Sequence, residues 1–217
     1  MTKRQRQIQI LQAAVRLFAQ KGFAATGIRE LSTAVGLNSA TLYHYTGTGG
    51  KEEILSTVMR SCLDELLSGG RASIAQSADP SIQLIHLVSS HVGLAALNPL
   101  TAKVTDQEIR ALSPDNLASL VSLRDDYESL FSMVLERGVR TGSFSFEETG
   151  ITRLALLEMC NGVAHWFHPD DRFSVQQVQQ KFVIFACRLV GCMPPNEQFF
   201  ATHSFMPPIL LDVEPRE

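Results

Sequence analysis

The chain has 217 residues, of which 45% are hydrophobic and 19% charged, so it is too apolar for a disordered protein and long enough for one large or two small domains. Its net charge of −3 hides an asymmetry, because residues 1–60 carry eight Lys/Arg and three Asp/Glu (+5), whereas residues 61–217 carry eleven and nineteen (−8). A small basic segment joined to a larger acidic body indicates that only the N-terminal part meets a polyanion, which argues against a protein that coats nucleic acid along its whole length.

Apolar residues recur at helical spacing along nearly the whole chain, and alternating strand-like runs are absent. We therefore predict an all-α fold of about nine helices. The first helix is expected from Gln7, with one apolar face and a stop at Gly22. Lys3, Arg4 and Arg6 are expected ahead of it, in a basic arm.

Two short helices are predicted next. Thr26 can cap a second helix that ends at Gly36, and Asn38 or Ser39 can cap a third that runs to about Tyr45. Two short helices joined through a glycine turn are typical of a helix-turn-helix.

The fourth helix is expected from Lys51, and Gly69-Gly70 should end or loosen it. This predicts a helix-turn-helix domain, a connector, a ligand-binding and dimerisation domain and a Pro-rich tail, over residues 1–50, 51–68, 69–193 and 194–217.

The acidic body should contain five further helices. Ser113-Pro114 is a strong start signal, with Ser at the cap and Pro at the first helical position. A break is expected at 168–171, and the tail, with five of the nine prolines, is expected to be extended. The predicted helices are 81–97, 101–111, 114–140, 147–167 and 174–192.

The third helix presents a small polar face. Ala40, Thr41 and His44 share a side without large aliphatic residues, and such a surface can approach base edges in DNA. Lys3, Arg4, Arg6 and Lys51 would reach phosphates. Periodicity alone leaves two interpretations open, a DNA-binding helix-turn-helix or a packing module with solvated charges.

The stretch from Ile8 to Leu55 resembles the TetR family of bacterial transcriptional regulators. The matching residues are Ala13-Ala14, Leu17-Phe18, Lys21-Gly22-Phe23, Thr26, Ile28, Leu31, Gly36-Leu37, Thr41-Leu42-Tyr43 and Lys51-Glu52-Glu53. The resemblance implies that Thr26 and Arg29 lie near the DNA backbone and that Lys51 clamps a phosphate. It also implies groove and phosphate contacts for residues of the recognition helix: Asn38, Ser39, Ala40, Thr41, Tyr43 and His44.

One stretch departs from the family pattern. Thr46 stands where the family usually has Phe, and the Gly-Thr-Gly-Gly run at 47–50 is about two residues longer than the family's step. A missing apolar plug and added glycines predict a more flexible joint between the recognition helix and the fourth helix.

Arg124 lies within the apolar stripe of the helix predicted at 114–140, together with Tyr127 and Phe131. A guanidinium on an apolar face needs a partner. Arg124 therefore either anchors an anionic ligand or forms a structural ion pair, for which Glu108 or Glu158 could serve.

A polar line runs along the otherwise apolar helix predicted at 147–167. Glu158, Asn161 and His165 share one face, whereas Trp166 belongs to the apolar remainder. The polar line could rim a pocket, order a dimer interface or satisfy backbone groups. The candidate ligand-binding residues are Arg124, Tyr127, Phe131, Glu158, Asn161, His165 and Trp166.

The segment from Ala111 to Val190 is similar to the C-terminal domain of one TetR subgroup. The shared runs are Leu112–Pro114, Arg124–Glu128, Gly138–Phe144 and Asn161–Pro169. Members of that subgroup often respond to acyl-CoA thioesters, so the resemblance implies an effector of that class. An apolar pocket with an arginine suits an acyl chain and an anionic head.

These features predict a homodimeric, cytoplasmic, one-component repressor that binds double-stranded operator DNA and is released by a small hydrophobic or acyl-CoA-type ligand. The dimer is expected through the helices at 147–167 and 174–192. No metal site is expected, because the four cysteines lack CxxC spacing, and no membrane segment is expected, because no spanning apolar run occurs. No motif indicates a cofactor or a catalytic residue.

Three alternatives stay open. A multidrug-type efflux repressor would sense a hydrophobic drug, and a cation preference with buried unpaired carboxylates would favour it. An enzyme on the helical body would need a pair such as Glu158 with His165. A protein–protein adaptor would not bind an operator at all.

Overall fold

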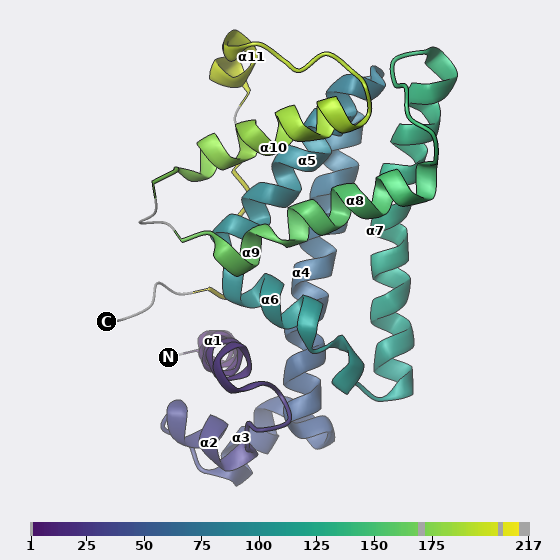
Figure 1. Ribbon diagram of the computed structural model, residues 1–217. Helices are drawn as coiled ribbons and strands as arrows, with labels where there is room; N and C mark the ends of the chain where they lie inside the picture. The colour runs from purple at the N-terminus through teal and green to yellow at the C-terminus, as the bar shows by residue number, and fades with distance from the viewer. Residues whose placement is uncertain (1, 169–171, 204–205, 213–217) are drawn as a thin grey trace.

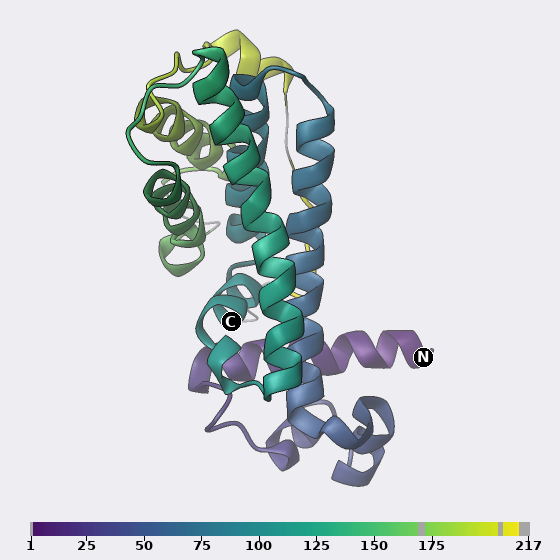
Figure 2. The same cartoon turned by 90° about the vertical axis from the view of Figure 1, so that its right-hand side faces the viewer.

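The computed structural model describes residues 2–168, 172–203 and 206–212, and within these ranges every regular element is a helix. Helices α1 to α3 form a head at one end of the molecule, and α11 lies at the other end, with the long helices α4 and α7 running side by side between them (Figures 1 and 2). The α-helices are α1 (Lys3–Lys21), α2 (Ile28–Ala34), α3 (Ser39–Thr46), α4 (Gly50–Ala75), α5 (Pro80–Leu97), α6 (Pro99–Gln107), α7 (Pro114–Thr141), α8 (Thr149–Asn161), α9 (Val163–Trp166), α10 (Val175–Leu189) and α11 (Glu197–Thr202), and the 3₁₀ turns are η1 (Gly47–Gly49) and η2 (Ile109–Ala111).

The predicted all-α fold is confirmed, and the described residues hold more helices than predicted. The helix expected at 147–167 is divided at Gly162 into α8 and α9, and the tail expected to be extended contains α11. Of the predicted break at 168–171, residues 169–171 lie outside the described residues.

Helix α1 begins four residues earlier than predicted. Thr2 Oγ1 accepts from the Gln5 amide at 3.2 Å, and Gln5 Oε1 accepts from the Thr2 amide at 2.7 Å, which forms a capping box. The arm predicted ahead of the first helix is therefore wrong, because Lys3 and Arg4 belong to the first helical turn.

The turn between α2 and α3 depends on Gly36, whose φ of +66° falls in the left-handed region that favours glycine. The Leu37 amide then returns to the Ser32 carbonyl at 2.8 Å. Of the two predicted caps of α3, Asn38 is the one used, since its Oδ1 accepts from the Thr41 amide at 2.8 Å.

The stretch at 47–50 forms the 3₁₀ turn η1, and Thr46 is buried at its start. Gly50 has φ +57°, and a Cβ there would lie 3.3 Å from Tyr43 Cε1. The recognition helix and α4 thus meet through a close contact between Gly50 and the Tyr43 ring.

Of the two effects predicted for Gly69-Gly70, a helix end is wrong, because α4 continues to Ala75. A Cβ at Gly70 would lie 2.8 Å from Leu130 Cδ1 and 3.1 Å from Tyr127 Cε2. Here glycine permits close packing of α4 against α7, and this tertiary contact outweighs its weak helix propensity.

Two hydrophobic clusters share the length of α4. The first joins α1 to α3 with the first half of α4 and with Val104 and Leu120 from the body. The second lies among α5, α7, α8 and α10 and is reached by Leu67 near the end of α4. Helix α4 therefore connects the head to the body as one continuous helix.

Helix α5 is long and apolar enough to cross a membrane by length and composition, but 78% of it is buried in the fold, as expected of a core helix.

Residues 206–212 form a strap that returns from α11 toward the head. Leu211 is buried in the first hydrophobic cluster, the one that contains α1 to α3, and Asn98 Nδ2 donates to the Pro208 carbonyl at 2.9 Å. The Asp212 carboxylate accepts from the amides of Leu100 and Thr101 at 2.7 and 3.0 Å. The tail is thus fixed to the start of α6.

Candidate functional site

The outer side of α3 is the candidate DNA-binding face. Leu42 is fully buried and anchors this helix, whereas Tyr43 keeps 45% of its surface exposed. All six residues predicted on the recognition helix are exposed or half-buried: Asn38, Ser39, Ala40, Thr41, Tyr43 and His44. A short helix with small polar residues on its open side has the shape required to enter a major groove.

Three exposed cations surround this face on the head. Lys3 and Arg4 lie in the first turn of α1, and Arg29 lies in α2. Within the described ranges their side chains form no ion pair, so they are available to phosphates. Arg6 differs, because its Nη1 donates to the Val35 carbonyl at 3.3 Å and caps the end of α2.

Thr26 is buried, and its side chain does not cap α2 as predicted. Its Oγ1 donates to the Gly22 carbonyl at 2.8 Å, and Gly27 occupies the cap position of α2. The hydroxyl instead closes the turn between α1 and α2.

Lys51 is held inside the head. Its Nζ donates to the carbonyls of Phe23 and Thr26 at 2.9 and 3.0 Å and lies 4.2 Å from the centroid of the Phe23 ring. Lys51 therefore ties the start of α4 to the α1–α2 turn, a positioning role that sequence reasoning missed.

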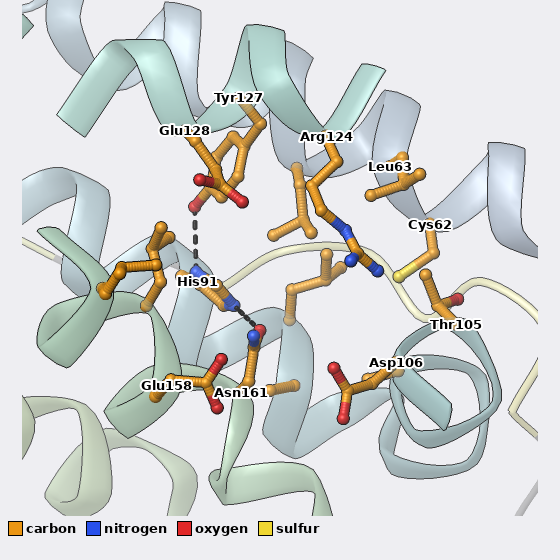
Figure 3. A pocket seen from close by; sticks show the side chains of 16 residues that line it. Cys62, Leu63, His91, Thr105, Asp106, Arg124, Tyr127, Glu128, Glu158 and Asn161 are labelled. Carbon is orange, nitrogen blue, oxygen red and sulfur yellow. Dashed lines mark hydrogen bonds between the residues drawn. The ribbon is translucent and has the colours of Figure 1, made fainter. Parts of the chain in front are cut away.

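The candidate ligand pocket lies in the body, enclosed by α4, α5, α6, α7 and α8 (Figure 3). Its volume is about 100 Å³. Four predicted residues line it, namely Arg124, Tyr127, Glu158 and Asn161, and apolar side chains such as Leu63, Leu94 and Leu157 complete the wall.

A chain of hydrogen bonds crosses the pocket, with His91 at its centre. His91 Nδ1 lies 3.0 Å from the Tyr127 hydroxyl, and His91 Nε2 lies 2.9 Å from Asn161 Oδ1 (Figure 3). An amide oxygen only accepts, so Nε2 carries the proton and Nδ1 accepts from the hydroxyl. Burial lowers the pKa of His91 to about 4 against a smaller opposing effect of Asn161, and burial raises the pKa of Tyr127. Both rings are therefore neutral at neutral pH.

Arg124 brings a half-buried guanidinium to the pocket without a protein partner. Figure 3 shows its side chain entering from α7. Within the part of the chain that the structure describes, Arg124 forms neither an ion pair nor a side-chain hydrogen bond. Of its two predicted partners, Glu108 accepts from the Phe23 amide at 3.2 Å instead, and Glu158 is exposed.

The other carboxylates of the pocket are paired or open to solvent. Glu128 Oε2 lies 3.5 Å from Arg153 Nη2, and Asp106 Oδ2 lies 3.7 Å from His165 Nε2. Asp106 and Glu158 are exposed. The pocket thus offers one unpaired cation inside and acidic groups at its rim.

Three predicted ligand residues lie outside the pocket lining. Phe131 is fully buried behind Tyr127, with ring centroids 5.6 Å apart, and so supports that ring. His165 turns to Asp106, and Trp166 stacks on Phe182 at 6.1 Å with 47% of its surface exposed. His165 and Trp166 both lie in α9, beyond the end of α8 at Asn161.

Sequence reasoning missed five polar lining residues: Cys62, His91, Thr105, Asp106 and Glu128. A signal existed for His91, because a histidine in the almost wholly apolar helix predicted at 81–97 needs a buried partner. No signal marked Thr105 and Asp106, since only the packing of α6 brings them to the pocket.

The described residues contain no group of three or more His, Cys, Asp or Glu side chains arranged to hold a metal ion. The predicted pair of Glu158 and His165 forms no hydrogen bond or ion pair within the same ranges, because His165 faces Asp106.

Two family models match the chain. The model described as bacterial regulatory proteins of the tetR family matches residues 10–58, and the model described as a tetracyclin repressor-like C-terminal domain matches residues 77–190. The first covers the candidate DNA-binding face, and the second covers most of the pocket.

Individual proteins are also similar. The HTH-type transcriptional repressor KstR2 of Rhodococcus jostii is 28% identical over 180 residues, which span 82% of this chain and 87% of that protein. The fatty acid metabolism regulator protein of Bacillus subtilis is 24% identical over 140 residues, 64% of this chain and 71% of that protein. The crystal structure of the regulator PfmR from Thermus thermophilus is 30% identical with a TM-score of 0.75, covering 86% of this chain and 100% of that one.

Proposed function

This chain belongs to the TetR family of bacterial transcriptional regulators and is a DNA-binding repressor that responds to a ligand, and we propose that its ligand is a small acyl compound with an anionic head, of the acyl-CoA type. The unpaired Arg124 guanidinium in an apolar pocket carries this proposal. A half-buried cation without a partner is stabilised when an anion binds beside it.

The charge pattern favours an anionic ligand over a cationic drug. An efflux-type sensor of cations would require buried carboxylates without partners. Here Glu128 is paired with Arg153, and Asp106 and Glu158 are exposed to water. Arg124 is the unpaired group inside the pocket.

The size of the pocket limits the part of the ligand that enters it. An apolar cavity of ~150 Å³ accommodates a benzene molecule, and this pocket holds about 100 Å³. A short or branched acyl group fits, and the bulk of the head must remain at the mouth, with its anionic group directed toward Arg124. The curated relative that regulates fatty acid metabolism supports an acyl ligand.

Helix α6 offers a route from the pocket to the head. Thr105 and Asp106 line the pocket, and Glu108, directly after the helix, accepts from the Phe23 amide in the α1–α2 turn at 3.2 Å. Helix α6 also packs against α1. We expect a bound ligand to shift α6 and thereby to favour a head position that no longer fits the operator, which requires unequal affinity for the two states.

The repressor is proposed to act as a homodimer through α8 and α10. Both helices carry large apolar side chains that the single chain leaves exposed, among them Ile151 at 69%, Leu154 at 47% and Phe185 at 48%. An apolar face of this kind is typical of a subunit interface. A two-fold dimer would present two recognition helices to two half-sites about one DNA turn apart.

The proposed division of labour follows the helices. Residues 1–50 bind DNA, α4 connects, residues 69–193 bind the ligand and the second subunit, and residues 194–217 form the tail. The protein is proposed to act in the cytoplasm as a regulator and not as an enzyme. In the pocket, His91, Tyr127 and Asn161 form structural hydrogen bonds with one another rather than a nucleophile–base pair.

Operator release by acyl-CoA thioesters tests the ligand class. DNA selected by the full-length protein from a random library serves as the operator, and its affinity is measured with short-chain and long-chain acyl-CoA thioesters. Arg124→Gln should raise the thioester concentration for half-release at least about tenfold, ~1.4 kcal/mol, because an ionic contact to the head is lost.

The matched control is Arg140→Gln, which removes an exposed cation from the last turn of the same helix. Both variants should bind the operator with wild-type affinity in the absence of thioester. Equal release of the wild type and Arg124→Gln at every thioester concentration would contradict the proposed anchor.

A further inference from the structure

The end of α10 brings two cysteines together. The Cys192 amide donates to the Cys187 carbonyl at 2.9 Å, and the Gly191 amide donates to the Arg188 carbonyl at 3.2 Å, with Gly191 at φ +70°. These bonds define a Schellman motif, in which the side chains at the two outer positions meet. In this chain both outer positions are cysteines, so the motif places the side chains of Cys187 and Cys192 next to each other.

Neighbouring backbone holds this helix end in place. The Ser145 amide donates to the Val190 carbonyl at 2.8 Å, and a Cβ on Gly191 would lie 2.8 Å from the Ser145 carbonyl oxygen. The turn is therefore packed against the loop between α7 and α8. The two sulfur atoms are kept near each other without ordering a loop, so little entropy opposes a bond between them.

The two thiols are unequal in the way that thiol oxidation requires. Cys187 is fully buried, whereas Cys192 is partly open to solvent. The neighbouring Cys187 thiol lowers the pKa of Cys192, and the neighbouring Cys192 thiol together with burial raises the pKa of Cys187. Cys192 is thus the accessible nucleophile and Cys187 the resolving thiol.

The remaining cysteines provide an internal comparison. Cys62 and Cys160 are buried, and burial raises the pKa of each thiol to about 12. Neither lies in a thiol pair within the described residues. Oxidation should therefore select the pair at the end of α10.

We propose that Cys187 and Cys192 form an oxidisable dithiol that closes to an intramolecular disulfide in the presence of a peroxide. The Cys192 thiolate attacks a peroxide oxygen, the O–O bond breaks, and a sulfenic acid forms with release of one water or alcohol. The Cys187 sulfur then attacks Cys192 Sγ, the S–O bond breaks, and a second water leaves. Two thiols are oxidised to one disulfide, and the peroxide is reduced by two electrons.

The site is separate from the DNA face and from the ligand pocket. It lies where the chain leaves α10, a proposed dimer helix, for α11 and the strap that reaches Asp212. The disulfide would fix the direction of that exit covalently. Because most intracellular thiols are kept reduced, a disulfide at this position is suited to transient sensing rather than to permanent stabilisation.

Peptide mapping tests the proposal directly. The reduced full-length protein is treated with hydrogen peroxide, free thiols are blocked with iodoacetamide, and the protein is digested with trypsin without reductant. Trypsin cuts after Arg188, between the two cysteines, so the disulfide appears as residues 182–188 joined to residues 189–216. We expect this linked pair to form while Cys62 and Cys160 are recovered alkylated.

Met193, 87% exposed and next to Cys192, reports whether the oxidant reached the segment. Recovery of Met193 as sulfoxide with Cys187 and Cys192 both alkylated would overturn the proposal. A link found between isotopically labelled and unlabelled chains in a mixture would also overturn it, since the bond would then join two molecules.

Three variants define the order of the step. Cys160→Ser should form the linked pair as the wild type does. Cys187→Ser should lose it and accumulate a sulfenic acid on Cys192 that dimedone traps, whereas Cys192→Ser should lose it and leave Cys187 alkylated. Ready oxidation of Cys187 in Cys192→Ser would refute the assigned roles.

Discussion

His91 holds the polar side of the pocket together through both ring nitrogens, with Tyr127 on one side and Asn161 on the other. Each partner comes from a different helix, α7 or α8, so one buried ring fixes the mutual position of three helices that enclose the pocket. A buried polar chain of this kind stabilises the fold only when every member is satisfied, and the neutral ring satisfies both of its neighbours.

The free energy of unfolding should therefore depend on pH through His91. Its pKa is about 4 in the folded protein against 6.5 as the ordinary value. Between these two pH values the unfolded chain binds more protons than the folded protein. The free energy of unfolding is therefore highest above about pH 6.5 and falls by about 3 kcal/mol as the pH decreases toward 4. Urea unfolding at a series of pH values measures the effect.

The variant His91→Gln supplies the comparison for this prediction. It should be less stable at pH 7 but should show a flatter decline between pH 6.5 and 4, because the imidazole is gone. Hydrogen bonds also lower the pKa values of Glu52 and Glu148. These groups titrate in both proteins, so their contributions cancel in the difference between the two pH curves. Parallel curves for the two proteins would show that His91 does not carry the dependence.

At the scale of the element, α6 is capped by a residue far away in the sequence. Its own cap residue, Asn98, uses its side chain to hold the strap, since Nδ2 donates to the Pro208 carbonyl and Oδ1 accepts from the Leu210 amide at 2.6 Å. The free amides at the start of α6 are satisfied by Asp212, which also accepts from the Thr101 hydroxyl. The element that connects the pocket to the head is thus positioned by the C-terminal strap.

Asp212→Ala should loosen the start of α6. Loss of a capping carboxylate at a helix N-terminus costs about 1–2 kcal/mol of stability. Hydrogen exchange should accelerate at the amides of Leu100 and Thr101, while Asp125→Ala, an exposed substitution on α7, should leave both rates unchanged. Unaltered exchange in Asp212→Ala would mean that the strap does not hold α6.

At the scale of the whole molecule, the charge is divided between a basic head and an acidic body. The structure reduces the number of cations available to DNA, because Lys51 and Arg6 bond within the head and Lys21 pairs with Glu30. Lys3, Arg4 and Arg29 remain exposed on the head, and Arg16 is half-buried. The acidic body should repel DNA and confine binding to the two heads of the proposed dimer.

Operator affinity should accordingly fall steeply with salt. Six phosphates neutralised by a dimer predict a log–log slope of about −5, and Arg4→Ala should reduce its magnitude by about 2 in a dimer. Arg140→Ala, at the far end of α7, should leave the slope unchanged. A slope near zero for the wild type would contradict binding through these cations.

The sequence by itself determined the helical class, the helix-turn-helix and most helix limits, because these depend on local periodicity and caps. Ser113-Pro114 began α7, and Gly142, at φ +75°, ended it as predicted. Asn38 capped the recognition helix, and four of the seven candidate pocket residues line the pocket. Arg124 and Asn161 could be predicted as pocket residues because the helical periodicity of the sequence shows a polar group on an apolar face.

Only the tertiary structure decided which partners these residues have. Gly70 became a packing contact instead of a helix end, Thr26 and Lys51 turned inward, and Asp212 capped a helix more than a hundred positions away in the chain. The partners in these contacts come from separate elements. Their positions follow from how the helices pack, and a pattern along a single helix does not contain that information.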